Sequence, residues 1–583
     1  MFIRHENKYP YYVIIITFFI FFHKFSIPFI WDDFPFIVNN ESIHSLNNLW
    51  KAFYEDIALL YRPLRQVLFT VNYALFSENP FGYHLTGLTL HICITLILYA
   101  SLNILFNNRL VNLAAVLIFA VHPVHSERVY LITGSFDLLG DFFTVLAFYF
   151  YLLHKKRKSE RLWYIALFTF LLGLLSSEVA IIFLPLIVAY DFIFTEKGIY
   201  KDRCIKAYLP ALFIIFGYLI ARYLTLHSFE RVEAEEGYFN ILFSMPHIFF
   251  QYLYLLFFPI HLTVYRTPQL PDNAYFFYNL ICLLGIALIL FQGFYSKRDK
   301  ALRFSILWFF ICLIPFSNIV NSGNLMEERY LYLPSFALSL FFIYLSRVVL
   351  VKRKKVFIFF SIAVLVLFAT LTINKGSFYQ SEEIMWQKSI RTLNFLYSNK
   401  YRETIKKRVH ALDINKPLQS NEILNRFQSK SFYNAANTLQ NNSCNVSIPL
   451  YMVALVLNYQ NIDSWHNLYN CYGELGRVDE VAVGLKKFIE AKNLPEKVKI
   501  NSLMMLTDYY INTNNPDWKK YSLELMKLNL DVNRKFEALK NAGIGFVRNN
   551  QLTLALHFFT LAEEVKDDQF VKNRIEQLQK ILQ

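Results

Sequence analysis

Charged and histidine side chains gather in a few short polar segments of this 583-residue chain, each beside a long apolar run. Carboxylates open the first segment, in Trp31-Asp32-Asp33, and the same segment later contains Tyr61-Arg62-Pro63-Leu64. The other segments are His122 to Arg128 (HPVHSER) followed by Gly134 to Asp137, then Glu178, then Pro315 to Asn318 and Glu327 to Ser335. A carboxylate can act as general base on a hydroxyl group, and arginines can hold a phosphate through charge-assisted hydrogen bonds. At a membrane boundary, this combination would suit an enzyme that uses a sugar carried on a lipid phosphate.

Each of these groups also has an ordinary structural explanation. Asp32 and Asp33 can simply end a helix and prefer water, and Glu328-Arg329 can form a local ion pair. His122 and His125 can be interface histidines. Their spacing would suit a pair of metal ligands only on a helix, whereas the proline between them disfavours a helix, and no third ligand is evident. The functional interpretation gains weight because charged groups at a membrane boundary are costly, and all these segments are expected on one face.

The composition is that of a membrane protein with a polar part attached. Apolar residues make up 55% of the chain and charged residues only 17%, against about 25% charged in a soluble domain. The mean hydropathy is +0.31. These values exclude a disordered chain, a collagen-like fibre and an ordinary cytosolic enzyme.

Apolar runs long enough to cross a bilayer, which takes roughly 20 helical residues, continue only to about residue 373. We predict eleven spans, at 11–30, 83–105, 110–124, 136–153, 161–176, 178–195, 205–224, 274–294, 302–318, 331–350 and 355–373. A twelfth run, 241–258, is bracketed by prolines, and we expect it to lie at the interface. The predicted domains are therefore a polytopic membrane domain, 1–373, and a helical domain, 374–583.

The basic loops set the predicted orientation. Lys and Arg concentrate in loops 154–161, 195–206, 296–303 and 351–355, which the positive-inside rule places in the cytoplasm. These four loops lie on the same side of the membrane only if the run 241–258 does not cross it. The basic loops then account for the net charge of +14, and a nucleic-acid partner is not needed to explain it. We expect residues 1–30 to be an uncleaved signal anchor and the C-terminal domain to be outside. It would be periplasmic in a bacterial inner membrane, which the short repeat region favours, or luminal in the ER.

The ordered set of polar segments resembles the transmembrane and tetratricopeptide O-mannosyltransferases (TMTC) and their bacterial relatives, within the GT-C glycosyltransferase superfamily. The resemblance covers about the first 390 residues and ends at Trp386, just after the last predicted span. It implies a GT-C-like all-α membrane fold, a dolichyl- or undecaprenyl-phosphate sugar donor with mannose favoured, and a hydroxyl acceptor, most naturally on a protein. It also implies Asp32 or Asp33 as catalytic base and Arg62, Arg128 and Arg329 as candidates for the donor phosphate. The implied pocket residues are Tyr61, His122, His125, Glu127, Asp137, Glu178, Glu328 and Tyr332.

The chain departs from this family at three positions. Ser135 stands where a basic residue usually precedes the Asp of the second outer loop, and Ser177 stands where Lys usually precedes the Glu matched by Glu178. Arg128 occupies a position where a small residue is more typical. With two positive charges lost and one gained, the alternatives are a rearranged phosphate site, a different sugar donor or a divergent enzyme.

Residues 374–583 show helical patterning that approaches the 34-residue tetratricopeptide (TPR) repeat. The better copy has small and aromatic packing residues at Gly543, Phe546, Ala555, Phe559 and Ala562, and a weaker copy begins at Trp465 and includes Leu468, Tyr469 and Tyr472. A generic helical domain is the alternative. Such a domain would suit capture of an acceptor or partner protein. Cys444 and Cys471 fall within it and could form a disulfide or remain two free thiols.

Two other functional classes stay open at this stage. A transporter or flippase of a lipid-linked saccharide would need ionisable residues or broken helices near the middle of several spans, whereas the charges here collect at one mouth. A non-catalytic scaffold for the repeat domain is kept open by Ser135 and Ser177. No metal site is predicted, and a divalent cation as cofactor is left undecided.

Overall fold

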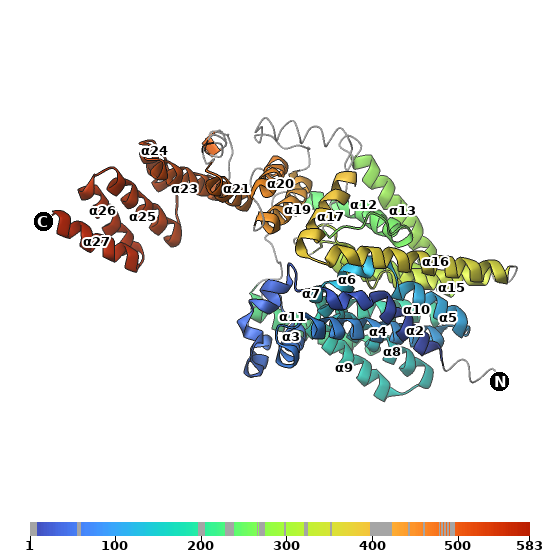
Figure 1. The fold of residues 1–583 in the computed structure, drawn as a ribbon. Coiled ribbons are helices and arrows are strands. Elements are labelled where there is room, and N and C mark those ends of the chain that lie inside the picture. Colours follow the sequence, from blue (N-terminus) through green and yellow to red (C-terminus); the bar gives the residue numbers. More distant parts are fainter. Residues whose placement is uncertain are drawn as a thin grey trace. The chain divides into compact units, whose positions relative to one another are not determined.

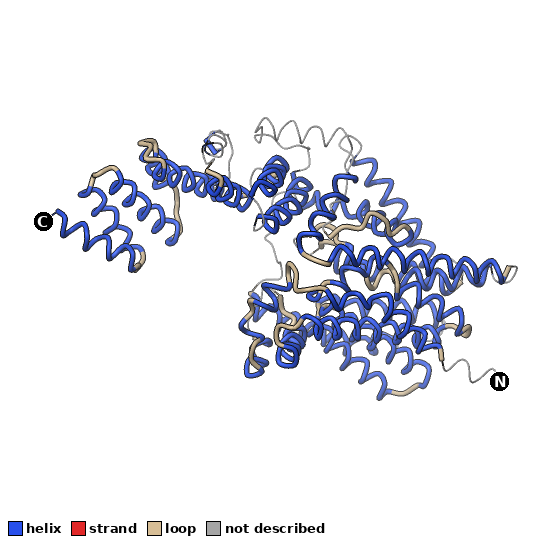
Figure 2. The backbone as a smooth tube through the Cα atoms, in the orientation of Figure 1, coloured by secondary structure: helices blue, strands red, loops and turns tan. Residues whose placement is uncertain are grey.

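The computed structural model is built from helices and connecting loops, and the described residues contain no β-strand beyond one isolated bridge residue (Figures 1 and 2). It describes residues 8–582 except 55–59, 196–203, 228–237, 265, 267–274, 296–298, 320–323, 350–352, 397–421, 441–443, 459–460, 477–478, 480–481, 483–484, 487–488 and 490–495. Parts of three predicted cytoplasmic loops (195–206, 296–303 and 351–355) therefore lie outside the described residues.

The chain divides by its internal contacts into two compact units, Met1–Leu396 and Tyr397–Gln583. The predicted boundary near residue 374 falls in the last turn of α16 (Lys354–Gly376). The first unit continues beyond it through α17 (Glu382–Leu396), which carries the buried Trp386.

Each of the eleven predicted spans coincides with a helix in the first unit. These helices are α2 (Tyr9–Phe21), α4 (Pro80–Leu105), α5 (Arg109–Ala120), α8 (Leu138–Arg157), α9 (Glu160–Ser176), α10 (Phe183–Phe194), α11 (Cys204–Leu226), α13 (Tyr275–Tyr295), α14 (Lys300–Leu313), α15 (Phe336–Val349) and α16. The run 241–258 forms α12 (Tyr238–Phe257) with Pro246 inside it.

Six of the described helical stretches are long and apolar enough to cross a membrane, or up to seven if a bent pair counts as one span. They carry large apolar side chains on their surfaces, such as Phe277 and Leu288 on α13 and Phe359 on α16, each more than half exposed. An apolar surface of this kind is stable against lipid and unfavourable against water. The chain is a multi-pass, all-α membrane protein, and the number eleven remains a prediction because several of its helices are short.

The helices pack closely where small residues meet. Gly173 on α9 approaches the short helix η6 (Glu178–Ile182), so that an added Cβ would lie 3.1 Å from Ala180 Cβ.

Asn112 on α5 donates to the carbonyls of Leu102 (3.3 Å) and Phe106 (2.9 Å), which ties the turn between α4 and α5 inside the protein. In a low-dielectric interior such bonds satisfy backbone groups that have no water available.

Short helices and turns connect the spans at the end where the polar segments lie. After α2 come η1 (Phe22–Ser26), the turn at residues 31–33, η2 (Phe34–Val38), η3 (Glu41–Ile43), η4 (Leu46–Phe53) and α3 (Pro63–Phe76). Between α5 and α8 the chain forms η5 (Pro123–His125), α6 (Ser126–Tyr130) and α7 (Ile132–Phe136), and η8 (Ile314–Phe316) and η9 (Glu328–Leu331) follow α14. Proline occupies the first turn of α3 and η5, where its missing N–H costs nothing.

The second unit contains α19 (Glu422–Gln440), α20 (Cys444–Leu457), α21 (Ile462–Glu474), α23 (Glu496–Asn512), α24 (Trp518–Met526), α25 (Val532–Arg548), α26 (Leu552–Val565) and α27 (Gln569–Leu582). The residues of the better repeat copy pack together: a Cβ on Gly543 would lie 2.8 Å from the Phe559 ring, and Ala555, Phe559 and Ala562 share one buried cluster. The small residue thus allows α25 and α26 to approach, as the pattern requires. Assignment to the TPR class remains a prediction.

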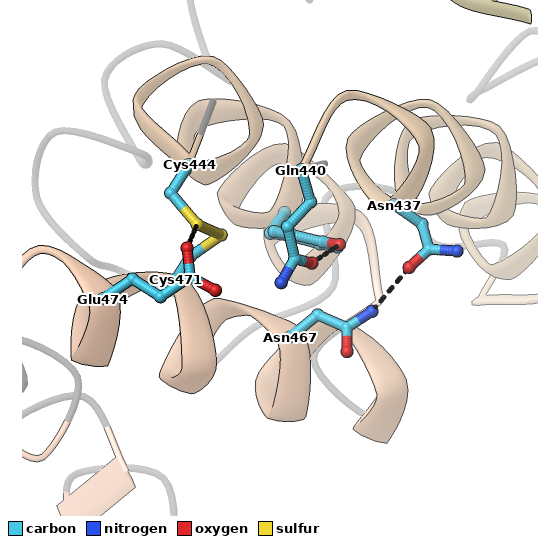
Figure 3. Close-up of a disulfide and its surroundings, with 7 residues drawn as sticks. Asn437, Gln440, Cys444, Asn467, Cys471 and Glu474 are labelled. Atoms are coloured by element: carbon cyan, nitrogen blue, oxygen red, sulfur yellow. Dashed lines mark hydrogen bonds between the residues drawn. A yellow bond between two sulfur atoms is a disulfide. The ribbon is translucent and has the colours of Figure 1, made fainter. Parts of the chain in front are cut away.

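Cys444 and Cys471 form a disulfide that joins α20 to α21 (Figure 3). Glu474 lies beside it, with Oε2 3.1 Å from the Cys444 sulfur. Nearby, Asn467 donates to Asn437 (3.0 Å), which links α21 to α19. The open alternative between a disulfide and two thiols is therefore resolved as a disulfide in this structure.

Candidate functional site

The turn that follows the first span places two neighbouring carboxylates differently. Asp33 is fully buried: its Oδ1 accepts from the backbone N–H of Thr133 (2.9 Å) and its Oδ2 from that of Ile30 (3.1 Å). Burial raises the pKa of the Asp33 carboxyl to about 7, and these N–H donors act in the opposite direction. Asp32 remains partly exposed. Asp33 thus fastens the turn to α7, while Asp32 is the carboxylate that solvent or a substrate can reach.

Helix α17 supports the same turn from the other side. The Trp31 backbone N–H donates to Glu382 (3.2 Å), and the Trp31 ring meets Trp386 edge to face, with centroids 5.5 Å apart. Trp31 has a φ of +51°, a conformation that a non-glycine residue adopts only when its surroundings favour it. The segment after the last span therefore helps to hold the acidic turn in place.

Three arginines converge on Asp137, at the start of α8. Asp137 Oδ1 lies 2.8 Å from Arg62 Nη1 and 3.0 Å from Arg65 Nε, and its Oδ2 lies 3.3 Å from Arg128 Nη1. Burial lowers the pKa of Arg65 to about 10, against the attraction of Asp137. Arg128 also lies 3.9 Å from Asp141, one turn further along α8. Asp137 is thus the anion that holds this group of guanidinium groups together.

Arg62 joins this cluster to Glu178. Its Nε and Nη2 donate to the two carboxylate oxygens of Glu178, both at 2.9 Å, in a bidentate pair. Burial disfavours the charged form of Arg62, but Glu178 and Asp137 more than offset this and raise its pKa above the usual value. The Glu178 side chain is 30% exposed, more than Asp137 at 19%.

A second ion-pair group lies around η9. Arg329 donates to Glu127 (2.9 Å) and lies 3.6 Å from Glu327, while its backbone carbonyl accepts from Arg128 Nε (3.3 Å). Glu328 points elsewhere: it accepts from Arg266 Nε (2.9 Å) and from the Thr263 N–H (2.8 Å). The predicted phosphate candidates Arg62, Arg128 and Arg329 therefore belong to one connected network, and each already has a carboxylate within 4 Å.

The predicted pocket histidines are buried packing residues. His122 Nε2 lies 3.0 Å from the Leu256 carbonyl, and its Nδ1 accepts from the Val124 N–H (3.3 Å), which caps η5. His125 Nε2 lies 2.7 Å from Ser335 Oγ. The Tyr332 ring lies beside that of His125, tilted by 47°, with ring centroids 4.6 Å apart. These side chains shape the interior behind the ion-pair network, and among the described residues no group of three or more His, Cys, Asp or Glu is arranged to hold a metal ion.

Two of the three departures from the family pattern, Ser135 and Ser177, have structural counterparts. Ser135 is buried, and Gly87 on α4 lies so close that an added Cβ would be 2.2 Å from Ser135 Oγ and 3.4 Å from Lys24 Nζ. Lys24, from η1 at the end of the first span, therefore brings an amino group close to the position where the family has a basic residue. Ser177 is packed against Gly140, where an added Cβ would be 2.5 Å from Ser177 Cβ.

Several residues of this site were not predicted from the sequence. They are Lys24, Arg65, Asp141, Arg222, Arg266 and Glu327. Arg65 could have been found, because it follows Arg62 at the spacing of one helical turn. Lys24 and Arg222 lie in apolar runs, where an isolated ionisable residue is itself a functional signal.

The site can perform acid–base and anion-binding chemistry. Thr133 connects the parts: its N–H donates to Asp33 and its carbonyl accepts from Arg65 (3.5 Å), which in turn contacts Asp137. A partly exposed carboxylate and a cluster of guanidinium groups are thereby held in one continuous assembly. Such an assembly can take a proton from a hydroxyl group and stabilise a phosphate that leaves.

Comparison with known proteins confirms the resemblance seen in the motifs. Residues 63–221 match the protein family described as dolichyl-phosphate-mannose-protein mannosyltransferase. The protein O-mannosyl-transferase F38B6.6 of Caenorhabditis elegans is 26% identical over 328 residues, which are 53% of this chain and 46% of that protein. The human protein O-mannosyl-transferases TMTC3 and TMTC1 are 30% and 36% identical, over 29% and 21% of this chain and 20% and 15% of their own length.

The chain thus spans less than half the length of these relatives. Among solved structures, the crystal structure of ArnT from Cupriavidus metallidurans bound to undecaprenyl phosphate aligns over 83% of this chain and 80% of its own, with 12% identity and a TM-score of 0.31. That likeness is too low to support an argument about fold or function.

Proposed function

We propose that this protein is a membrane glycosyltransferase that moves a sugar, with mannose favoured, from a polyprenyl-phosphate donor to a hydroxyl group of an acceptor protein. The observation that carries the proposal is the continuous assembly from the acidic turn to the arginines around Asp137, in which Thr133 binds both Asp33 and Arg65. The sequence similarity to protein O-mannosyl-transferases supports the same reaction class.

In the proposed reaction Asp32 is the general base. Its carboxylate takes the proton of the acceptor hydroxyl, the hydroxyl oxygen forms a bond to C1 of the sugar, and the bond from C1 to the phosphate oxygen breaks. The polyprenyl phosphate leaves with the bonding electron pair, and guanidinium groups of the network stabilise its added negative charge. Asp33 has a positioning role, because both of its oxygens are occupied by backbone N–H groups.

The second unit is proposed to lie on the outer side of the membrane, periplasmic in a bacterium, and to bind the acceptor protein through a TPR-like face. Its Cys444–Cys471 disulfide supports this side, since disulfides persist in oxidising compartments. The four basic loops support it independently.

The test is a transfer assay with the purified full-length protein in lipid nanodiscs, offering polyprenyl-phosphate mannose and polyprenyl-phosphate glucose in parallel. Released polyprenyl phosphate is the readout, so that donor hydrolysis is detected even without the natural acceptor. We expect turnover with one donor and a loss of about 10²- to 10⁴-fold in Asp32→Asn, the range for loss of a general base. Asp299→Asn, which removes a carboxylate from an ion pair with Arg347, is the matched control and should keep full activity. Equal turnover in the wild type and Asp32→Asn would overturn the assignment.

A further inference from the structure

Arg222 is a buried arginine near the C-terminal end of α11, and among the residues that the structure describes no carboxylate lies within 4 Å of it. It is 7% exposed, and its Nη1 has no hydrogen-bond partner in the described part of the chain. The other buried arginines of the site differ from it, because each lies within 4 Å of a carboxylate: Arg62, Arg65, Arg128, Arg266 and Arg329. An unneutralised cation at this depth is costly unless something anionic binds it.

The surroundings of Arg222 connect it to the site. The Tyr218 side chain, one helical turn earlier on α11, lies within electrostatic reach of Arg222, Glu178 and Arg62. The Tyr218 hydroxyl also contacts the Tyr61 backbone carbonyl (3.5 Å), and the two tyrosine rings lie 6.0 Å apart. Arg222 therefore lies beside the Tyr61-Arg62 segment.

Arg62 is less suited than Arg222 to receive an incoming anion. Its Nε and both terminal nitrogens already donate to Glu178 and Asp137, so a ligand would have to compete with two carboxylates. Arg222 lies on the same helix as Tyr218, and its Nη1 has no hydrogen-bond partner among the residues that the structure describes. A guanidinium group matches a phosphate in both geometry and charge.

We infer that Arg222, assisted by Tyr218, binds the phosphate group of the polyprenyl-phosphate donor. This inference rests on the proposed function, because it assigns the phosphate subsite of that same reaction. It gives Arg62 a different role, which is to hold Glu178 and Asp137 in place.

The experiment measures binding, without chemistry, of fluorescently labelled undecaprenyl phosphate to the full-length protein in nanodiscs of neutral lipid. We expect Arg222→Gln to bind at least about tenfold more weakly than the wild type, because a charge-assisted contact is lost. Arg222→Lys should bind with intermediate affinity, since a lysine keeps the charge without the planar fork. Arg303→Gln is the matched control: Arg303 donates to the backbone carbonyls of Gly293 and Phe294 near the cytoplasmic loop, and its loss should leave binding unchanged.

Thermal unfolding separates a binding role from a structural one. Without ligand, Arg222→Gln should unfold at the same temperature as the wild type or higher, because it removes an uncompensated buried charge. Added undecaprenyl phosphate should raise the unfolding temperature of the wild type and not that of the variant. A variant that unfolds much earlier without ligand would show that Arg222 serves the fold, and would overturn the inference.

Two further outcomes distinguish the inference from the proposed function. Wild-type affinity in Arg222→Gln would overturn the phosphate assignment and leave the glycosyltransferase proposal standing. No binding of undecaprenyl phosphate to the wild type would remove the donor class and both proposals together. Inorganic phosphate and phosphatidylglycerol serve as competitors, and displacement of the label by either one at equal concentration would identify a general anion or headgroup site and overturn the inference.

Discussion

Replacing Asp137 with asparagine should destabilise the first unit strongly, because three guanidinium groups depend on this one carboxylate. Asparagine keeps the size of the side chain and an acceptor oxygen, so the perturbation is mainly the loss of the charge. Arg62, Arg65 and Arg128 contact Asp137 at 2.8, 3.0 and 3.3 Å. Arg62 retains Glu178 and Arg128 retains Asp141, whereas Arg65 has no other carboxylate within 4 Å among the described residues.

The expected magnitude follows from these contacts. Two unit charges about 4 Å apart interact with about 4 kcal/mol at an effective dielectric constant of about 20, and breaking a buried pair on one side typically costs about 3–5 kcal/mol. The side chains of Arg65 and Asp137 are 8% and 19% exposed, so solvent screens this pair only partly. We therefore expect Asp137→Asn to lower the free energy of unfolding by about 3–4 kcal/mol, mostly through Arg65 and through repulsion among the three arginines.

The assay is a double-mutant cycle measured by unfolding in detergent micelles. The double variant Asp137→Asn/Arg65→Gln should be more stable than the sum of the two single effects predicts, by at least about 1 kcal/mol, because the unpaired cation is removed with its partner. Asp299→Asn, at the partly exposed pair with Arg347, should cost less than about 1 kcal/mol. Strict additivity in the cycle, or a loss at Asp137 no larger than that at Asp299, would refute the view that Asp137 organises the arginines.

Three further predictions test the acidic turn and the second unit. Burial raises the pKa of Asp33 to about 7, so its carboxyl binds a proton more tightly in the folded than in the unfolded state. The contribution of Asp33 to the stability of the folded protein therefore falls as the pH rises from about 4 to 7. Asp33→Asn should flatten this dependence in unfolding temperatures recorded across that range, and an unchanged slope would contradict the assignment. Gly543→Ala should lower the free energy of unfolding by about 1–3 kcal/mol, because its Cβ would meet a phenylalanine ring at 2.8 Å. The control Gly217→Ala, on an open helix surface, should be neutral or stabilising. Equal unfolding temperatures for the two variants would count against close packing in the repeat. Reduction of the Cys444–Cys471 bond, which closes a loop of sequence separation 27, should lower the free energy of unfolding of the second unit by about 3–4 kcal/mol in the chain-entropy model. The measurement is unfolding with and without reductant. An unchanged stability would show that the bond is absent or does not stabilise the unit.

Composition and apolar patterning were enough to predict the all-α membrane class, and the polar segments could be selected as the place where chemistry is expected. Each predicted span overlaps a helix, because an apolar run can satisfy its backbone in lipid only as a helix, but only six or seven of the described helical stretches are long and apolar enough to cross a membrane. The acidic turn, the second outer loop and Glu178 could likewise be selected early, because ionisable groups at a membrane boundary are rare and costly. The packing pattern of the repeat was also readable, since a glycine opposite an aromatic residue marks a close helix pair.

Which of these residues lie in contact with one another is visible only in the folded chain. Asp32 and Asp33 are neighbours of identical type, and only the backbone N–H groups of Thr133 and Ile30 distinguish the fastened carboxylate from the accessible one. Lys24 and Arg222 lie in apolar runs of the sequence, and only packing shows that Lys24 approaches Ser135 and that the turn of α11 before Arg222 approaches Tyr61. Periodicity and composition report how a residue sits on its own element, whereas charge pairing depends on distances between elements, which the order of residues along the chain does not contain.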